Sequence, residues 1–226
     1  MALTFGTTAD AALHGVKGLI YGKAGVGKTR LAATAPTPIM ISAEAGTLSL
    51  RHEALPMLTV TSMGDLMDIY RWASTSREAR QFATLYIDSL TEIGEKVLAT
   101  AKAKARDPRQ AYGEMIEQII PMVKGFRDLQ GFNVFFTAKQ EAIRDEGTGM
   151  VLNGPMMPGK QVGPQLPYLF DEVFRLGVGS HEGKSYTFLQ TRPDLQNDAK
   201  DRSGALEPME RPDLTHVINL ITGVKK

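Results

Sequence analysis

A glycine-rich turn near the start of the chain constrains the fold more than any other feature. Residues 22–29 have the sequence Gly-Lys-Ala-Gly-Val-Gly-Lys-Thr, which fits the pattern GxxxxGK[ST] without a mismatch. The apolar run 16–21 before it predicts a buried strand, and a helix is predicted over 28–35 after it. Glycines let the backbone wrap closely around a phosphate, and the helix N-terminus adds partial positive charge. The turn is therefore predicted to be a P-loop that binds the phosphates of a nucleotide.

Each residue type in the P-loop has a chemical role. Lys28 is predicted to neutralise the β- and γ-phosphates of ATP, and Thr29 to coordinate Mg²⁺ through its hydroxyl. The alternative is a chance glycine-rich turn, which the strand–helix context disfavours. The predicted nucleotide contacts are Gly22, Lys23, Ala24, Gly25, Val26, Gly27, Lys28, Thr29 and Arg30.

A second metal-binding group is expected from a neighbouring strand. The apolar run TLYID over Thr84–Asp88 predicts a strand that ends in a carboxylate. Ligands gather at the carboxyl ends of strands in open α/β sheets, so Asp88 is predicted to hold Mg²⁺ through water. The alternative is that Asp88 caps the helix expected from Thr91.

Hydrolysis of ATP also requires a group that orients or activates water. Glu44 follows the strand predicted over Pro38–Ser42, where a carboxylate would face the γ-phosphate from the adjacent strand. The runner-up is Glu92, on the helix after Asp88. A turn or cap residue is the alternative interpretation of Glu44.

Alternation of strands and helices over the first 140 residues predicts a doubly wound, mostly parallel α/β sheet in a single domain, 1–226. Further strands are expected at 57–61 and 131–138, and helices at 64–73, 92–105 and 112–126, the last kinked or divided at Pro121. Three C-terminal strands are expected to extend the sheet as an antiparallel edge, at 171–178, 184–191 and 215–221. The Gly/Pro/Met-rich segment 141–165 is expected to be a long connection without regular structure.

Composition excludes several other classes of site. Cys is absent, which excludes disulfides, thiolate metal sites and Cys nucleophiles and fits a reducing compartment. The net charge of +1, from 26 basic and 25 acidic residues, neither demands nor excludes nucleic acid, so any basic surface must be local. The first ten residues lack a secretory signal, and no apolar run approaches the roughly 20 residues of a membrane span. A cytoplasmic protein without membrane contact is expected.

The order of these motifs resembles the RecA-type ATPase core. A P-loop comes first, then a strand followed by Ala43-Glu44, then an apolar strand ending in Asp88-Ser89. The resemblance implies that Glu44 is catalytic and that a polar residue ending the strand 135–140 senses the γ-phosphate. The register leaves Thr137, Lys139 and Gln140 open for this sensor, and Gln140 is our choice.

A second resemblance lies near the C-terminus. The segment Ala-Lys-Asp-Arg-Ser-Gly over 199–204 looks like the Lys-x-Arg-x-Gly element of RadA and DnaB-type proteins, although Asp201 and Ser203 depart from the usual residues. This implies that Lys200 and Arg202 reach the ATP of an adjacent subunit, within a self-assembled ring or filament. A solvated, salt-bridged loop is the alternative.

The compact chain is also similar to phage-encoded recombination proteins, which implies binding to single-stranded DNA. The candidate DNA-binding residues are Lys102, Lys104, Arg106, Arg109, Arg144 and Lys160, in two segments that follow the ATP-site strands. An exposed helix end, with cations favoured by the helix dipole, is the alternative for the first segment, and no aromatic residue interleaves it.

These observations predict a DNA-dependent ATPase that uses ATP and Mg²⁺, assembles on single-stranded DNA and anneals or pairs strands, in the host cytoplasm if it is phage-encoded. One alternative is a nucleotide-switched helicase loader or assembly ATPase. Another is a small-molecule kinase, which the scarcity of arginine in 141–165 disfavours.

Overall fold

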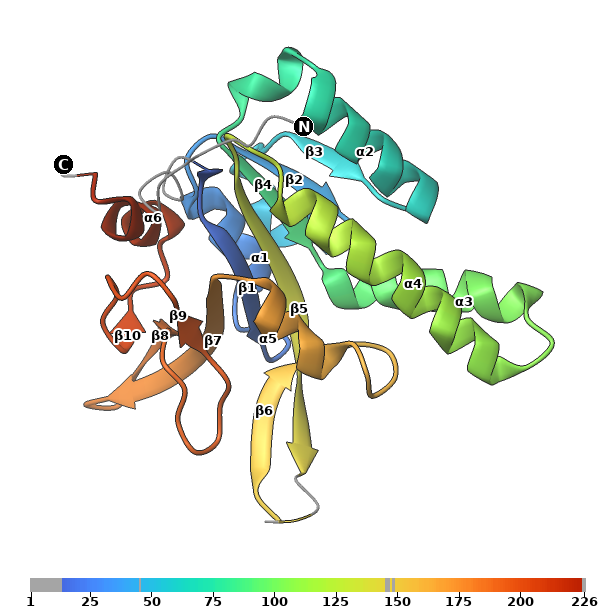
Figure 1. Ribbon diagram of the computed structural model, residues 1–226. Coiled ribbons are helices and arrows are strands. Elements are labelled where there is room, and N and C mark those ends of the chain that lie inside the picture. Colours follow the sequence, from blue (N-terminus) through green and yellow to red (C-terminus); the bar gives the residue numbers. More distant parts are fainter. Residues whose placement is uncertain (1–13, 45, 145–146, 148, 225–226) are drawn as a thin grey trace, which may run out of the picture.

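Strands and helices alternate around one central sheet in the computed structural model of the chain (Figure 1). The structure describes residues 14–44, 46–144, 147 and 149–224. The first ten residues, for which no secretory signal is predicted, lie outside the described residues. Among the described helices, none combines the length and apolarity required to cross a membrane.

The sheet is mostly parallel, as predicted, and its strand order is β10-β8-β7-β1-β5-β4-β2-β3. Every pairing along the path from β7 to β3 is parallel. β8 and β10 then extend the sheet antiparallel, as expected for 184–191, whereas β7, which we expected at the antiparallel edge, pairs parallel with β1. The bounds are β1 Lys17–Gly22, β2 Pro38–Ser42, β3 Met57–Thr59, β4 Thr84–Asp88, β5 Asn133–Arg144, β6 Val151–Pro155, β7 Glu172–His181, β8 Lys184–Gln190, β9 Lys200–Asp201 and β10 Met209–Glu210.

Helices cover both faces of the sheet, because strands that are buried on both sides need apolar cover on both. Alternation along β1 sends Leu19 and Tyr21 to the core beneath α2, α3 and α4, and Ile20 to the core beneath α1 and α6. The helices are α1 Lys28–Leu31, α2 Met63–Thr75, α3 Leu90–Lys104, α4 Pro108–Arg127, α5 Leu166–Leu169 and α6 Leu214–Thr222. Short 3₁₀ turns occupy Ala32–Thr34, Thr47–Leu50, Glu78–Gln81 and Gly163–Gln165.

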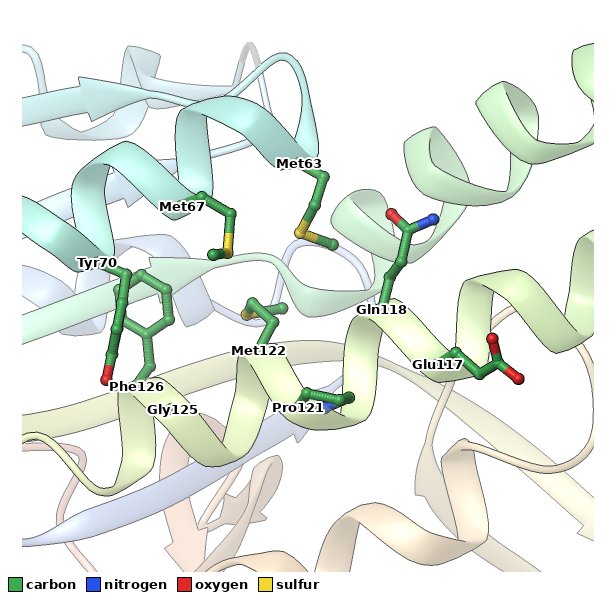
Figure 2. Close-up of a pocket in the computed structure, with 9 residues that line it drawn as sticks. All are labelled: Met63, Met67, Tyr70, Glu117, Gln118, Pro121, Met122, Gly125 and Phe126. Atoms are coloured by element: carbon green, nitrogen blue, oxygen red, sulfur yellow. The ribbon is translucent and has the colours of Figure 1, made fainter.

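Pro121, which we expected to kink or divide the fourth helix, does not divide it. α4 runs without a break over Pro108–Arg127, with Pro121 inside it (Figure 2). A proline removes one helical hydrogen bond, but Met115, Ile119 and Phe126 are buried along one side of α4 and hold the helix on the core.

Pro121 also lines an apolar hollow of about 380 Å³ between α2 and α4. Figure 2 shows Met63 and Met67 of α2 and Met122 of α4 pointing into the space between the two helices. Tyr70 of α2 closes one end by an edge-to-face contact with Phe126, at 5.6 Å between ring centroids. The hollow shares no lining residue with the P-loop, so it is separate from the nucleotide site.

The strand predicted over 215–221 is also wrong, because this segment forms α6. Its β-branched residues favour a strand, yet Leu214, Val217 and Ile218 have helical spacing and are all buried. The side chain of Asp213 accepts a hydrogen bond from the backbone N–H of His216 over 3.0 Å, which caps the first turn. Gly223, with a φ of 70°, ends the helix in the left-handed conformation. Caps and burial therefore outweigh the local strand propensity.

The segment 141–165 is not the unstructured connection that we expected. β5 continues to Arg144 and pairs antiparallel with β6, so the two strands form a hairpin that projects beyond the sheet (Figure 1). Contacts distant in sequence hold its base. The hydroxyl of Tyr21 donates to the carbonyl of Asn153 over 3.0 Å, and the Asn153 backbone N–H donates to the carbonyl of Gln196 over 2.7 Å.

Candidate nucleotide-binding site

The P-loop connects β1 to α1 at the carboxyl edge of the parallel strands. Gly25 and Gly27 have φ angles of 74° and 106°, in the left-handed region that favours glycine. A Cβ atom at either position would meet nothing within 4 Å, so it is the backbone conformation and not crowding that favours glycine there. A Cβ at Gly22 would instead lie 2.7 Å from the carbonyl oxygen of Leu176, because β7 packs against the start of the turn. The backbone thus has the shape of a phosphate cradle.

Lys28 opens α1 and directs its ammonium into the turn. The Nζ atom donates to the carbonyl of Gly22 over 2.8 Å and to that of Lys23 over 3.1 Å. Burial lowers the pKa of Lys28, while the charges of Asp88 and Glu44 raise it. The two carboxylates therefore act electrostatically on the same ammonium, and the three side chains form one charged site.

Asp88 is buried at the end of β4 and accepts hydrogen bonds from two hydroxyls. Thr29 donates to one carboxylate oxygen over 2.7 Å, and Thr137 donates to the other. The cap of α3 is Ser89, whose hydroxyl accepts from the backbone N–H of Glu92 over 3.4 Å. Asp88 is thus not the helix cap, which was the alternative to a metal role. Hydroxyl and carboxylate oxygens are ligands that Mg²⁺ takes together with phosphate oxygens, so the pair fits a nucleotide-bound metal.

Glu44 follows β2 and is half-buried. The hydroxyl of Ser89 donates to its Oε1 atom over 2.5 Å, which holds the carboxylate against the residue that follows Asp88. Lys96 of α3 fixes the adjacent backbone by donating to the carbonyls of Ala43 over 2.6 Å and Val60 over 3.0 Å. Because β2 and β4 are neighbours, Glu44 and Asp88 lie at the same edge of the sheet.

The runner-up base, Glu92, is engaged elsewhere. Lys139, near the middle of β5, contacts Glu92 over 2.5 Å and Glu95 over 3.1 Å. The hydrogen bond that Lys139 donates to Glu92 is the main reason that the pKa of Lys139 is raised. An ion pair already holds the Glu92 carboxylate, which leaves Glu44 better placed to act on water.

The three sensor candidates have different surroundings. Thr137 contacts the Asp88 carboxylate, and Lys139 forms the ion pairs with α3. Strand alternation directs Gln140 to the opposite face from both. Its Oε1 atom is buried without a hydrogen-bond partner among the described residues. Of the three candidates, Thr137 rather than our choice Gln140 therefore contacts the Asp88 carboxylate.

A hollow of about 420 Å³ opens beside the P-loop, which is within the usual size of a ligand pocket. It lies between α1 and the β7–β8 pair. The lining residues are Gly25, Val26, Gly27, Arg30, Leu31, Thr34, Leu176, Thr187 and Pro212.

Comparison with protein-family models matches residues 14–203 to the family AAA_24, described as AAA domain. The chain belongs to this AAA domain family. The AAA domain is a P-loop ATPase with an α/β fold, and the family match covers the P-loop, Glu44 and Asp88.

The comparison of this chain with curated proteins found no match. Among solved structures, the chain is similar to the crystal structure of a KaiC-like protein from the hyperthermophilic archaeon Pyrococcus horikoshii OT3. The TM-score is 0.47 and the sequence identity 15%, and the match covers 79% of each chain.

The basic residues predicted to bind DNA are all exposed in the AAA domain. They lie on three segments: Lys102, Lys104, Arg106 and Arg109 where α3 turns into α4, Arg144 at the end of β5, and Lys160 between β6 and α5.

The stretch 101–109 contains no aromatic residue, but the fold places the Tyr112 ring among three of these cations. The Lys102 Nζ atom lies 5.1 Å from the centroid of the Tyr112 ring. Arg109, Tyr112 and Lys160 line a hollow of about 400 Å³ between α4 and the connection after β6. The spacing of Arg109 and Tyr112, one turn apart on a helix, is the sequence feature that points to this arrangement.

Lys200 and Arg202 do not reach the P-loop of their own chain. β9 pairs with Glu172 and Val173 at the amino end of β7, whereas the P-loop lies at the carboxyl end of the parallel neighbour β1. Lys200 donates to the carbonyl of Pro167 over 2.8 Å, and Arg202 forms an exposed ion pair with Asp171 at 2.6 Å. Within one chain, Lys200 and Arg202 thus lie in the salt-bridged loop that was the alternative interpretation. A role of either residue at ATP requires a neighbouring subunit.

Proposed function

We propose that this AAA domain is an ATP- and Mg²⁺-dependent protein that binds single-stranded DNA and anneals or pairs strands, as phage recombination proteins do. The observation that best supports the proposal is that α3 runs from the nucleotide site to a group of exposed cations. This helix begins at Leu90, two residues after Asp88, and ends among the exposed cations Lys102 and Lys104. One rigid element therefore joins the nucleotide site to a basic surface.

The proposed roles at the nucleotide follow from the geometry. The N–H groups of the P-loop cradle the phosphates, and Lys28 exchanges its carbonyl partners for β- and γ-phosphate oxygens. Thr29 and Asp88 hold Mg²⁺, which neutralises charge on the phosphates when bound. Glu44, held by Ser89, orients the attacking water.

The proposed DNA contacts begin at the hollow between α4 and the connection after β6. Lys102, Arg109 and Lys160 neutralise backbone phosphates there, and the Tyr112 ring offers a face for a base. Arg144, on the projecting β5–β6 hairpin, extends the same charge toward a longer strand. These contacts are electrostatic, so affinity is expected to fall steeply with salt.

We further propose that subunits assemble into a ring or filament with ATP between them. Lys200 and Arg202 then act on the nucleotide of the next subunit, where a cation stabilises the charge of phosphoryl transfer. Assembly of this kind uses a heterologous, head-to-tail interface.

Fluorescence anisotropy with a labelled oligothymidine, Mg²⁺ and a non-hydrolysable ATP analogue tests the function. We expect saturable, salt-sensitive binding that is weakened without nucleotide and in Lys28→Ala. Replacement of Lys102 and Arg109 by Gln should weaken binding, while replacement of Arg77 and Lys124 by Gln serves as the matched charge control, since both are exposed and neither lines the hollow. No binding above that of a neutral polymer at low salt would overturn the proposal. A stable complex with a replication protein, but no annealing of complementary strands, would favour the helicase-loader alternative.

A further inference from the structure

The outer half of the β7–β8 hairpin is a two-stranded ribbon. β7 pairs with β1 only as far as Arg175, and beyond this point it pairs with β8 alone. Figure 1 shows the hairpin extending away from the rest of the sheet. Its exposed tip is therefore not needed to complete the core.

One face of this ribbon carries two aromatic rings in a row. Phe188 lies opposite Gly177 and Tyr186 lies opposite Gly179 in the antiparallel register. The rings are tilted by 48° and their centroids are 6.0 Å apart. Tyr186 is 48% exposed, and Phe188 is half-buried.

The glycines opposite these rings shape the face. A Cβ at Gly177 would lie 2.7 Å from the Phe188 ring, and one at Gly179 would lie 2.6 Å from the Tyr186 ring. The two rings therefore lie close over the backbone of β7, in space that a larger residue at either glycine would fill. A ring that is already ordered loses little conformational entropy when a planar ligand stacks on it.

Cations flank the two rings on the same face. A Cβ at Gly177 would also lie 2.9 Å from an Nη1 atom of Arg175, so that guanidinium adjoins the Phe188 ring. The Arg175 Nη1 donates to the neutral Gln190 over 3.3 Å, and its Nε has no hydrogen-bond partner among the described residues. Lys184 lies on this face at the other end of the row and is exposed.

Carboxylates also lie near this face: besides Glu182 and Asp194, the charge of Asp198 acts together with that of Arg175 on the Tyr21 hydroxyl. Glu182 lies at the tip of the hairpin beside His181, at 3.8 Å, and both side chains are mostly exposed. Asp194 faces Gln190 and is held by the backbone N–H groups of Gln196 and Asn197.

We propose that this aromatic face of the β7–β8 ribbon is a stacking platform for the bases of single-stranded nucleic acid. Bases stack on the outer sides of Tyr186 and Phe188, and the phosphates of the same strand lie toward Arg175 and Lys184. Neighbouring aromatic rings flanked by cations are the combination that single strands require. The inference rests on the proposed function, and it adds a contact surface that is separate from the Tyr112 hollow.

The test compares the full chain with the double variant Tyr186→Leu, Phe188→Leu, which keeps apolar bulk but removes the π-faces. Oligothymidine affinity, measured by anisotropy with the ATP analogue, should fall about tenfold or more, because stacking on aromatic side chains supplies much of single-strand affinity. Tyr186→Phe should bind as the parent does. Tyr168→Leu is the matched control, since Tyr168 is 83% exposed on α5. Retained binding of a labelled nucleotide shows that the double variant is folded.

An abasic strand of the same length separates stacking from charge, because parent and double variant should bind it equally. Equal oligothymidine affinity of parent and double variant would overturn the inference while leaving the proposed function intact. An equal loss on the abasic strand, or a change of oligomeric state in the double variant, would also overturn it. Absence of any single-strand binding by the parent would overturn both.

Discussion

The hydroxyl of Thr29 at the start of α1 lies 2.7 Å from the carboxylate of Asp88 at the end of β4. These residues are 59 positions apart in the chain and come from different strand–helix units. Their contact brings together two side-chain oxygens of the kind that Mg²⁺ binds, the pair that we propose as its ligands.

Asp88→Asn keeps the shape of this side chain but removes its charge. We expect Mg²⁺-dependent ATP turnover to fall at least about a hundredfold, because metal-assisted charge stabilisation is worth several kcal/mol. Steady-state phosphate release over a Mg²⁺ titration measures this. Asp68→Asn, on an exposed i,i+3 ion pair of α2, is the matched control and should leave turnover unchanged. Parent-like turnover by Asp88→Asn would remove Asp88 from the metal site.

Lys28→Ala removes the ammonium that lies in the P-loop. Nucleotide affinity should fall at least about tenfold, since hydrogen bonds to charged groups contribute roughly 1.5–3 kcal/mol. Titration with a labelled ATP analogue measures the loss. Lys23→Ala, whose exposed side chain lies in the same turn, is the control, and an equal effect of both changes would contradict the special role of Lys28.

Glu44→Gln should retain ATP but hydrolyse it slowly, by about 10²–10⁴-fold, because an amide accepts no proton from water. The amide oxygen preserves the hydrogen bond from Ser89, so the fold is expected to be unaffected. Single-turnover hydrolysis with pre-bound ATP isolates this step. Glu92→Gln is the comparison, and a larger defect in it than in Glu44→Gln would reverse the two assignments.

Lys200→Ala and Arg202→Ala should leave nucleotide binding by isolated subunits intact and lower turnover only in the assembly. The ion pair of Arg202 with Asp171 is exposed, so its loss should lower the free energy of unfolding by less than about 1 kcal/mol. Mixing Arg202→Ala subunits with Lys28→Ala subunits tests action in trans. Mixed assemblies should regain part of the turnover, and no gain at any mixing ratio would argue against it.

Glu172, 1% exposed at the start of β7, controls the pH dependence of stability. Burial and the nearby Asp201 raise its pKa from 4.5 to about 8. The folded chain therefore binds this proton more tightly than the unfolded chain does, and the free energy of unfolding falls as pH rises from 4.5 to about 8. Glu172→Gln should remove this loss and be more stable than the parent at the upper end of that window. Urea unfolding across the window measures it, and a parent-like slope in the variant would contradict the assignment.

The parallel core was predictable because its signals are local. The P-loop has a fixed spacing, and Thr84–Asp88 is apolar up to its terminal carboxylate. The pairing of β1, β4 and β5 then follows from the rules of parallel α/β sheets. Lys28, Asp88 and Glu44 meet because each follows a strand whose carboxyl end lies at the same edge.

The errors have non-local causes. α6 is fixed by burial of Leu214 and Val217 against the far side of the sheet, which the residues 215–221 alone do not reveal. The β5–β6 hairpin depends on Tyr21, more than a hundred residues away in sequence. The packing of Tyr112 beneath Lys102 depends on the angle at which α4 returns along α3, which no spacing in the sequence specifies.

α3 has 15 residues, or about 22 Å at 1.5 Å per residue, and hydrogen bonds of Ser89 and Thr91 anchor its N-terminal end. Such a helix acts as a lever. A tilt of about five degrees at the anchored end displaces the far end by about 2 Å, from the length given by the helical rise. Under the proposed function, loss of a phosphate that tilts α3 by this angle would move Lys102 and Lys104 by about 2 Å, enough to break a direct contact with a bound strand.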